Sequence, residues 1–103
     1  MNLSLEPRHL KEVKNILEKF VPHHEVWAFG SRVTGKAKEY SDLDLTVISK
    51  KPLPLKTMSL MKEAFSESNL PFKVDLVDWS LISEEFQKVI EGGYCVISKS
   101  SPT

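Results

Sequence analysis

The sequence of 103 residues is short of several features that would define its class. It has a single cysteine, Cys95, which excludes an internal disulfide and suits a reducing compartment. No apolar run approaches the roughly 20 residues that a membrane-spanning helix needs. Residues 1–7 lack the basic start and the apolar core of a signal peptide. We therefore expect a cytoplasmic protein without a membrane segment.

Neither sign of charge dominates, because 14 Lys and Arg residues balance 14 Asp and Glu residues. This balance leaves no general basic field and argues against direct binding of nucleic acid through its phosphates. The length is enough for one hydrophobic core and too short for two. We expect a single domain over residues 1–103, with a frayed tail over residues 98–103.

The hydrophobic pattern predicts helices and strands that alternate along the chain. The predicted helices cover residues 7–20, 31–35, 54–68 and 83–92, and the predicted strands cover residues 26–29, 42–49, 72–79 and 94–97. This order predicts an α/β or α+β domain, with a mixed sheet of about four strands flanked by helices.

Two acids lie at the start of the otherwise apolar second strand. Asp42 and Asp44 are two residues apart, so both carboxylates project from one face of the strand, roughly 6–7 Å apart along the chain. Like charges on one face repel each other and resist burial. A divalent metal ion between them is the natural expectation.

Asp75 is a third acid, in the middle of the strand predicted at residues 72–79. The helix-containing return of about 20 residues before it favours a right-handed parallel crossover, which would make the two strands neighbours. Asp75 would then lie beside Asp42 and Asp44. Asp78 is out of phase with Asp75, so we expect it on the opposite face as a solvated or turn-capping residue.

A glycine–serine turn follows the first predicted strand. Gly30 permits a backbone conformation that other residues resist and lets a ligand approach closely. Ser31 starts a short helix whose first N–H groups and hydroxyl point outward together, which favours a phosphate. Arg32 would add positive charge there or form a structural salt bridge. A plain turn that caps a short helix is the alternative for Gly30 and Ser31.

Two other patterns carry less weight. The run from Gly30 to Lys36 resembles a P-loop, but Ala37 stands where a P-loop needs a Ser or Thr hydroxyl, and no long helix follows. His23 and His24 are candidate metal ligands, yet adjacent histidines in a turn are more often solvated.

The three acids and the turn together predict phosphoryl chemistry. Magnesium prefers oxygen ligands completed by water and substrate phosphates, and a pair of ions about 3.5–4 Å apart activates the attacking oxygen and neutralises the leaving pyrophosphate. We expect two Mg²⁺ ions, replaceable by Mn²⁺, at Asp42, Asp44 and Asp75, with Asp75 as the candidate base. These residues allow phosphoryl transfer or metal-dependent phosphodiester hydrolysis, and the phosphate-binding turn favours a nucleoside triphosphate as substrate.

The combined motifs resemble a known family. They are Gly30-Ser31-Arg32-x-x-Gly35, Ser41-Asp42-x-Asp44-Leu45 and Val74-Asp75-Leu76-Val77-Asp78. Together they resemble the DNA polymerase β-like nucleotidyltransferase superfamily, and more narrowly its minimal nucleotidyltransferase (MNT) family. The resemblance covers nearly the whole chain and implies a polymerase-β-like nucleotidyltransferase core. By the family pattern, Asp42, Asp44 and Asp75 correspond to metal ligands, and Gly30 and Ser31 to the turn that binds the nucleotide phosphates.

The resemblance also implies a partner. MNT proteins of this size are commonly encoded beside a helical HEPN-type protein, and several such pairs are toxin–antitoxin systems in which the nucleotidyltransferase adenylylates a tyrosine of the toxin. The implied activity is Mg²⁺-dependent transfer of AMP from ATP, or of another nucleoside monophosphate from its triphosphate, to a hydroxyl of such a partner within a hetero-oligomer. The alternative is a non-catalytic module that neutralises or completes the helical partner by contact alone.

Overall fold

The structure is a computed structural model that describes residues 3–99, and these residues form four α-helices, four strands and one 3₁₀ helix. In chain order the elements are α1 (Pro7–Phe20), β1 (Glu25–Phe29), α2 (Ser31–Thr34), β2 (Leu43–Ile48), α3 (Leu55–Ser66), β3 (Val74–Asp78), the 3₁₀ helix η1 (Trp79–Leu81), α4 (Glu84–Glu91) and β4 (Tyr94–Ser98).

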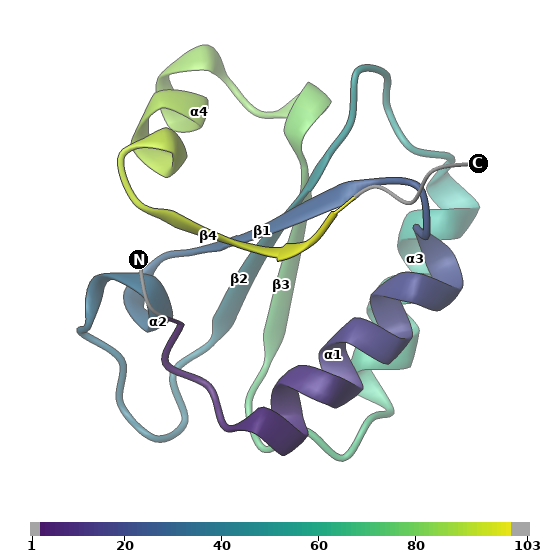
Figure 1. The fold of residues 1–103 in the computed structure, drawn as a ribbon. Coiled ribbons are helices and arrows are strands. Elements are labelled where there is room, and N and C mark those ends of the chain that lie inside the picture. The colour runs from purple at the N-terminus through teal and green to yellow at the C-terminus, as the bar shows by residue number, and fades with distance from the viewer. Residues whose placement is uncertain (1–2, 100–103) are drawn as a thin grey trace.

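The strands form one mixed sheet in the order β3-β2-β1-β4 (Figure 1). Strand β1 runs antiparallel to both β2 and β4, whereas β2 and β3 are parallel and are connected through α3. The predicted mixed sheet is confirmed, and so is the expectation that β2 and β3 are neighbours. The parallel register pairs Asp44 with Asp75.

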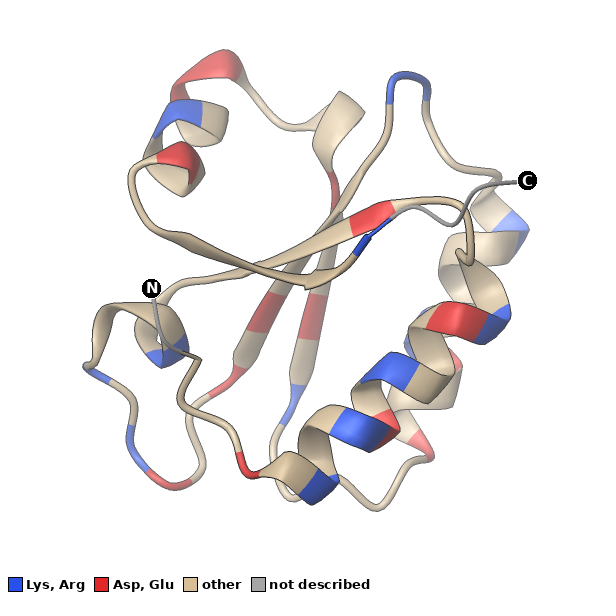
Figure 2. Cartoon of the chain, in the orientation of Figure 1, with Lys and Arg blue, Asp and Glu red and all other residues tan. Residues whose placement is uncertain are grey.

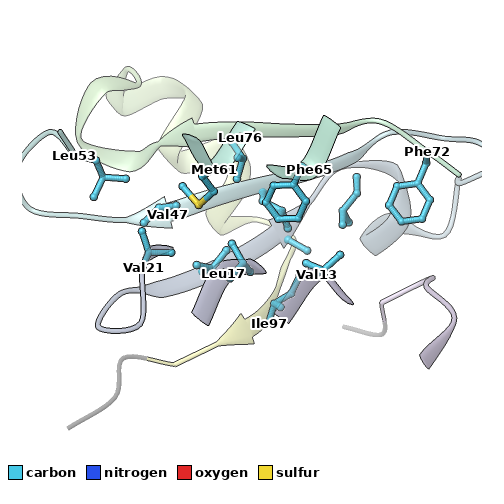
Figure 3. Close-up of a cluster of buried hydrophobic side chains, with 14 of the residues drawn as sticks. Val13, Leu17, Val21, Val47, Leu53, Met61, Phe65, Phe72, Leu76 and Ile97 are labelled. Carbon is cyan, nitrogen blue, oxygen red and sulfur yellow. The ribbon is translucent and has the colours of Figure 1, made fainter. Parts of the chain in front are cut away.

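Helices α1 and α3 pack side by side on one face of the sheet (Figure 1). Pro7 occupies the first turn of α1, and the helical spacing of Val13 and Leu17 directs both side chains to the sheet, where neither is exposed. Met61 and Phe65 of α3 complete the helical side of this core (Figure 3). Burial of these apolar side chains supplies most of the driving force for folding.

The other face of the sheet, which we call the open face, lies on the side of α2 and α4 (Figure 1). Strand alternation brings to it Trp27, Phe29, Asp44, Thr46, Asp75 and Tyr94. The rings of Trp27 and Tyr94 stack with centroids 3.9 Å apart, and Phe29 meets Phe86 of α4 edge to face at 5.7 Å. The open face is therefore partly apolar around β1 and β4 and acidic along β2 and β3.

The predicted boundaries differ from the structure at a few residues. Ser98 belongs to β4 and pairs with Val26, so the expectation that the frayed tail begins at residue 98 is wrong at that position, because strand pairing extends one residue further. Residues 100–103 of that predicted tail lie outside the described residues. No helix in the described part of the chain has the length and hydropathy of a bilayer span.

Candidate active site

The three predicted carboxylates come from the same region of the open face. Leu43 and Leu45 are fully buried on the helix side of β2, so the intervening Asp44 must project to the open face. Asp42, which immediately precedes β2, shares the phase of Asp44. Asp75 lies directly beside Asp44 on the parallel strand β3. Figure 2 shows the resulting acidic bands side by side on the two strands.

Gly30 brings the glycine–serine turn against this acidic group. Its backbone has φ +80° and ψ −156°, a conformation that is essentially restricted to glycine. A Cβ atom at this position would overlap Oδ2 of Asp44 and lie 3.3 Å from its Cγ. Glycine is therefore required here both by the backbone angles and by the carboxylate of Asp44. Ser31 follows directly as the first residue of α2.

Burial and like charge act together on Asp44. Burial raises the pKa of the Asp44 carboxyl above its usual range, and the negative charges of Asp75 and Asp42 raise that pKa further. Nζ of Lys73 lies 3.8 Å from Oδ1 of Asp75 and offsets part of the negative charge, although the two side chains are 73% and 48% exposed. A carboxylate whose pKa is raised by burial and by two neighbouring carboxylates favours a bound cation.

Arg32 has a different environment from the one predicted. Its side chain is buried, and its guanidinium donates hydrogen bonds to the backbone carbonyls of Ser4, Glu39 and Ser41. Burial lowers the pKa of the guanidinium, and the negative charge of Asp42 opposes that change. These contacts favour the structural role that the sequence left open, with carbonyls in place of a salt-bridge partner. A contact between Arg32 and a nucleotide phosphate stays a prediction.

Asp78 lies on the face opposite Asp75, as its phase predicts, but it is not solvated. Its carboxylate is buried and accepts hydrogen bonds from the hydroxyl of Ser49, from the amide of Leu53 at 2.7 Å and from both the amide and the hydroxyl of Ser80. The turn-capping role is confirmed at η1, and the solvated alternative is wrong because four donors converge on this carboxylate.

A comparison with protein families assigns the chain. The family model described as "Polymerase beta, Nucleotidyltransferase" matches residues 11–102. This protein belongs to that nucleotidyltransferase family. It is also 52% identical, over 101 residues, to a probable protein adenylyltransferase, MntA, of Haemophilus influenzae, an alignment that covers 98% of this chain and 89% of the relative. The predicted family and the predicted enzyme class, a nucleotidyltransferase, are thereby confirmed.

Solved structures with the same nucleotidyltransferase fold include chains of toxin–antitoxin complexes. One, from a toxin–antitoxin solved with AMP-PNP, superposes with a TM-score of 0.74 at 20% identity, covering 89% of this chain and 74% of that chain. Another comes from a tri-AMPylated HEPN toxin of Shewanella oneidensis in complex with its MNT antitoxin, with a TM-score of 0.68 at 18% identity and coverage of 93% and 74%. Both comparisons confirm the predicted polymerase-β-like fold.

The donor atoms fit the magnesium that the nucleotidyltransferase family implies. Asp42, Asp44 and Asp75 offer only oxygen ligands, which Mg²⁺ prefers. Among residues 3–99, no three Asp, Glu, His or Cys side chains are grouped closely enough to hold one ion between them. Mg²⁺ does not need such a cage, because it commonly binds through one or two carboxylates and completes its shell with waters and substrate phosphates.

The remaining predicted residues are placed as follows. Gly30 lies beside Asp44 and Ser31 follows it in the chain. The role of these two residues as the phosphate-binding turn stays a prediction, as does metal binding by the three acids. His23 and His24 precede β1 at the end of the sheet where Glu25 pairs with Ile48, away from Asp44. The motifs do not point to Lys73. Its position two residues before Asp75, and so on the same face, is the signal that could have identified it.

Proposed function

We propose that this nucleotidyltransferase transfers AMP from ATP to a hydroxyl group of a partner protein, and that the partner is a HEPN-type toxin. The observation that carries the proposal is the parallel pairing of Asp44 with Asp75 on the open face, with Gly30 against the Asp44 carboxylate. The relative from Haemophilus influenzae, a probable protein adenylyltransferase, supports a protein acceptor. Because the reaction uses ATP, we place the protein in the cytoplasm.

In the proposed reaction, Gly30 and Ser31 hold the β- and γ-phosphates of ATP at the start of α2. The hydroxyl oxygen of the acceptor forms a bond to the α-phosphorus, and the bond from that phosphorus to the bridging oxygen of pyrophosphate breaks. Asp75 accepts the proton of the hydroxyl. Asp42 and Asp44 would hold Mg²⁺, which would supply charge neutralisation for the attacking oxygen and for the leaving pyrophosphate.

The geometry favours this order of groups along the open face. The Gly30 turn follows β1 directly, and Phe29 at the end of β1 pairs with Asp44. Asp75 lies on the far side of Asp44 from β1. Phosphates at the turn would therefore be followed by the metal-binding oxygens of Asp44 and then by the base, which is the order that an attack on the α-phosphorus requires.

The test uses ATP labelled at the α-phosphate, Mg²⁺ and a HEPN-type protein as acceptor. We expect label on the acceptor with the wild type, and none when the label is at the γ-phosphate. Asp44→Asn and Asp75→Asn should each lower the rate by at least about a hundredfold, because removal of one catalytic or metal-binding group typically costs that much. Glu63→Gln, a matched loss of one charge on the exposed surface of α3, should keep the wild-type rate.

A second outcome would support the alternative that the protein acts by contact alone. In that case the complex with the HEPN-type protein would form without transfer of label, and Asp44→Asn would leave the affinity of that complex unchanged. Release of nucleotides from RNA or DNA without any triphosphate would instead indicate a metal-dependent nuclease. Either result would overturn the proposed transfer.

A further inference from the structure

The guanidinium of Arg32 joins three segments that are separate in the sequence. Nε donates to the carbonyl of Ser41 at 2.9 Å, Nη1 donates to the carbonyl of Ser4 at 2.9 Å, and Nη2 donates to the carbonyl of Glu39 at 3.2 Å. The guanidinium also lies 4.3 Å from the centroid of the Phe72 ring. Only the planar fork of arginine presents several N–H donors in fixed directions while it stacks on an aromatic ring.

The bond to Ser41 bears directly on Asp42. The carbonyl of Ser41 and the amide nitrogen of Asp42 belong to the same planar peptide unit, so fixing that oxygen fixes the plane from which Asp42 starts. Asp42 itself precedes β2, and the ladder with β3 begins at Leu43, whose amide donates to the carbonyl of Lys73 at 2.9 Å. The peptide that carries Asp42 is thus held by the sheet on its far side and by Arg32 on its near side.

The backbone of Arg32 belongs to the other half of the site. Arg32 follows Gly30 and Ser31 in α2, so the residue that holds the peptide of Asp42 is covalently part of the predicted phosphate turn. The amide of Ser4 donates to the carbonyl of Arg32 at 2.7 Å, which makes the link between residues 4 and 32 reciprocal. The segment before α1 therefore also holds Arg32 in place, through two hydrogen bonds with Ser4.

We propose that Arg32 is a positioning residue that fixes Asp42 relative to the Gly30–Ser31 turn. It does so through its hydrogen bonds to the carbonyls of Glu39 and Ser41, while its hydrogen bonds with Ser4 hold Arg32 itself in place. This inference rests on the proposed function, because it assigns Asp42 a cation to bind. This role does not require Arg32 to contact the nucleotide or the metal ion, because its hydrogen bonds go to backbone carbonyls. Its effect reaches the site only through the peptide before Asp42.

The experiment measures binding of Mn²⁺ alone, from the loss of the free-ion EPR signal, together with hydrogen exchange of residues 36–42. Arg32→Gln should weaken Mn²⁺ binding by about 10–100-fold, the range found when groups that orient metal ligands are removed. Arg32→Lys keeps the charge but not the fork, and should fall between Arg32→Gln and the wild type. Exchange at residues 36–42 should accelerate in both variants, while exchange in α4 stays unchanged.

Two controls separate the possible failures. Arg8→Gln removes an exposed arginine whose hydrogen bond and ion pair are to Glu6, outside residues 36–42, and should leave both readouts at wild-type values. Asp44→Asn should abolish Mn²⁺ binding; if it does not, or if the wild type binds no Mn²⁺, the proposed metal site fails and takes this inference with it.

If Asp44→Asn does abolish binding while both Arg32 variants bind Mn²⁺ as the wild type does, the positioning role alone is overturned. A merely structural role would lower the folded fraction without changing the Mn²⁺ affinity of the folded molecules. If circular dichroism finds Arg32→Gln unfolded, Arg32→Lys decides by the same criteria.

Discussion

Replacing Asp44 by asparagine should make the metal-free protein more stable while it removes activity. Asp44 is flanked by Asp42 and Asp75, and burial together with these two charges raises the pKa of its carboxyl. A raised pKa means that the folded protein resists the ionised form. The neutral amide of the introduced asparagine keeps the shape of the side chain and removes the repulsion, so the variant should unfold at a higher temperature.

The register of the strands sets the magnitude. Neighbouring strands lie about 4.8 Å apart, and two unit charges about 5 Å apart repel each other by about 0.8 kcal/mol in water and by about 3 kcal/mol at an effective dielectric constant of 20. Asp75 is half exposed and is paired with Lys73, so the lower end of this range applies. A gain of about 1 kcal/mol corresponds to an increase in Tm of about 4–8 °C for a domain of this size.

The assay is thermal unfolding of both proteins in metal-free buffer between pH 4 and pH 8. Because the pKa of Asp44 is raised, its ionisation lowers stability progressively as the pH rises through that pKa, and the penalty is absent in acid, where both the folded and the unfolded protein are protonated. The advantage of Asp44→Asn should therefore grow from acid to neutral pH. Added Mg²⁺ should raise the Tm of the wild type more than that of the variant.

A lower Tm for Asp44→Asn at neutral pH would refute the reasoning, and so would an equal gain at pH 4 and pH 8. The exposed Glu63→Gln variant controls for the loss of one charge, and its stability should stay within about 0.5 kcal/mol of the wild type.

Two further predictions follow from backbone and hydrogen bonding. Gly30→Ala should lower the free energy of unfolding, measured with urea, by about 1–3 kcal/mol because of its backbone angles, and should abolish AMP transfer because the added methyl displaces the carboxylate of Asp44. Gly35 also has a positive φ, of +84°, but a Cβ atom there would meet nothing within 4 Å, so Gly35→Ala should lower stability by about 1–2 kcal/mol and retain transfer. Equal activity of the two variants would contradict this explanation. Asp78→Asn should lower stability by about 1–3 kcal/mol. Burial would raise the pKa of Asp78, but the hydrogen bonds that it accepts, including that from Leu53, outweigh burial and lower this pKa. The contribution of Asp78 to stability is therefore present at neutral pH and is lost as the pH falls through the lowered pKa. A destabilisation of Asp78→Asn that persists unchanged in strong acid would exclude this explanation.

The positions of the acids could be predicted because they depend on local periodicity. A strand alternates its side chains strictly, so Asp42, Asp44 and Asp75 reach one face once β2 and β3 are known to be parallel neighbours. The length of the connection through α3 is enough to favour that arrangement. The phase of Asp78 is fixed by the same alternation, and its placement opposite Asp75 follows from it.

The environments of Arg32 and Asp78 could not be predicted, for a physical reason. Arg32 bonds to main-chain carbonyls, and every residue carries a carbonyl, so no residue type in the sequence marks its partners. Asp78 is buried because Ser49, Leu53 and Ser80 converge on it from three places in the chain. Such convergence depends on tertiary packing, which the hydrophobic pattern does not describe.

Alternate residues of strand β2 lie in two different environments, the apolar core and the acidic open face. Leu43, Leu45 and Val47 have no exposed surface and lie on the side of α1 and α3, whereas Asp44, between Leu43 and Leu45, lies on the open face. Deleting one residue within this strand would exchange the two sets, burying a carboxylate in the apolar core and placing leucine on the open face. Changes of length should therefore be confined to exposed connections such as residues 50–52, and β2 should admit substitutions only.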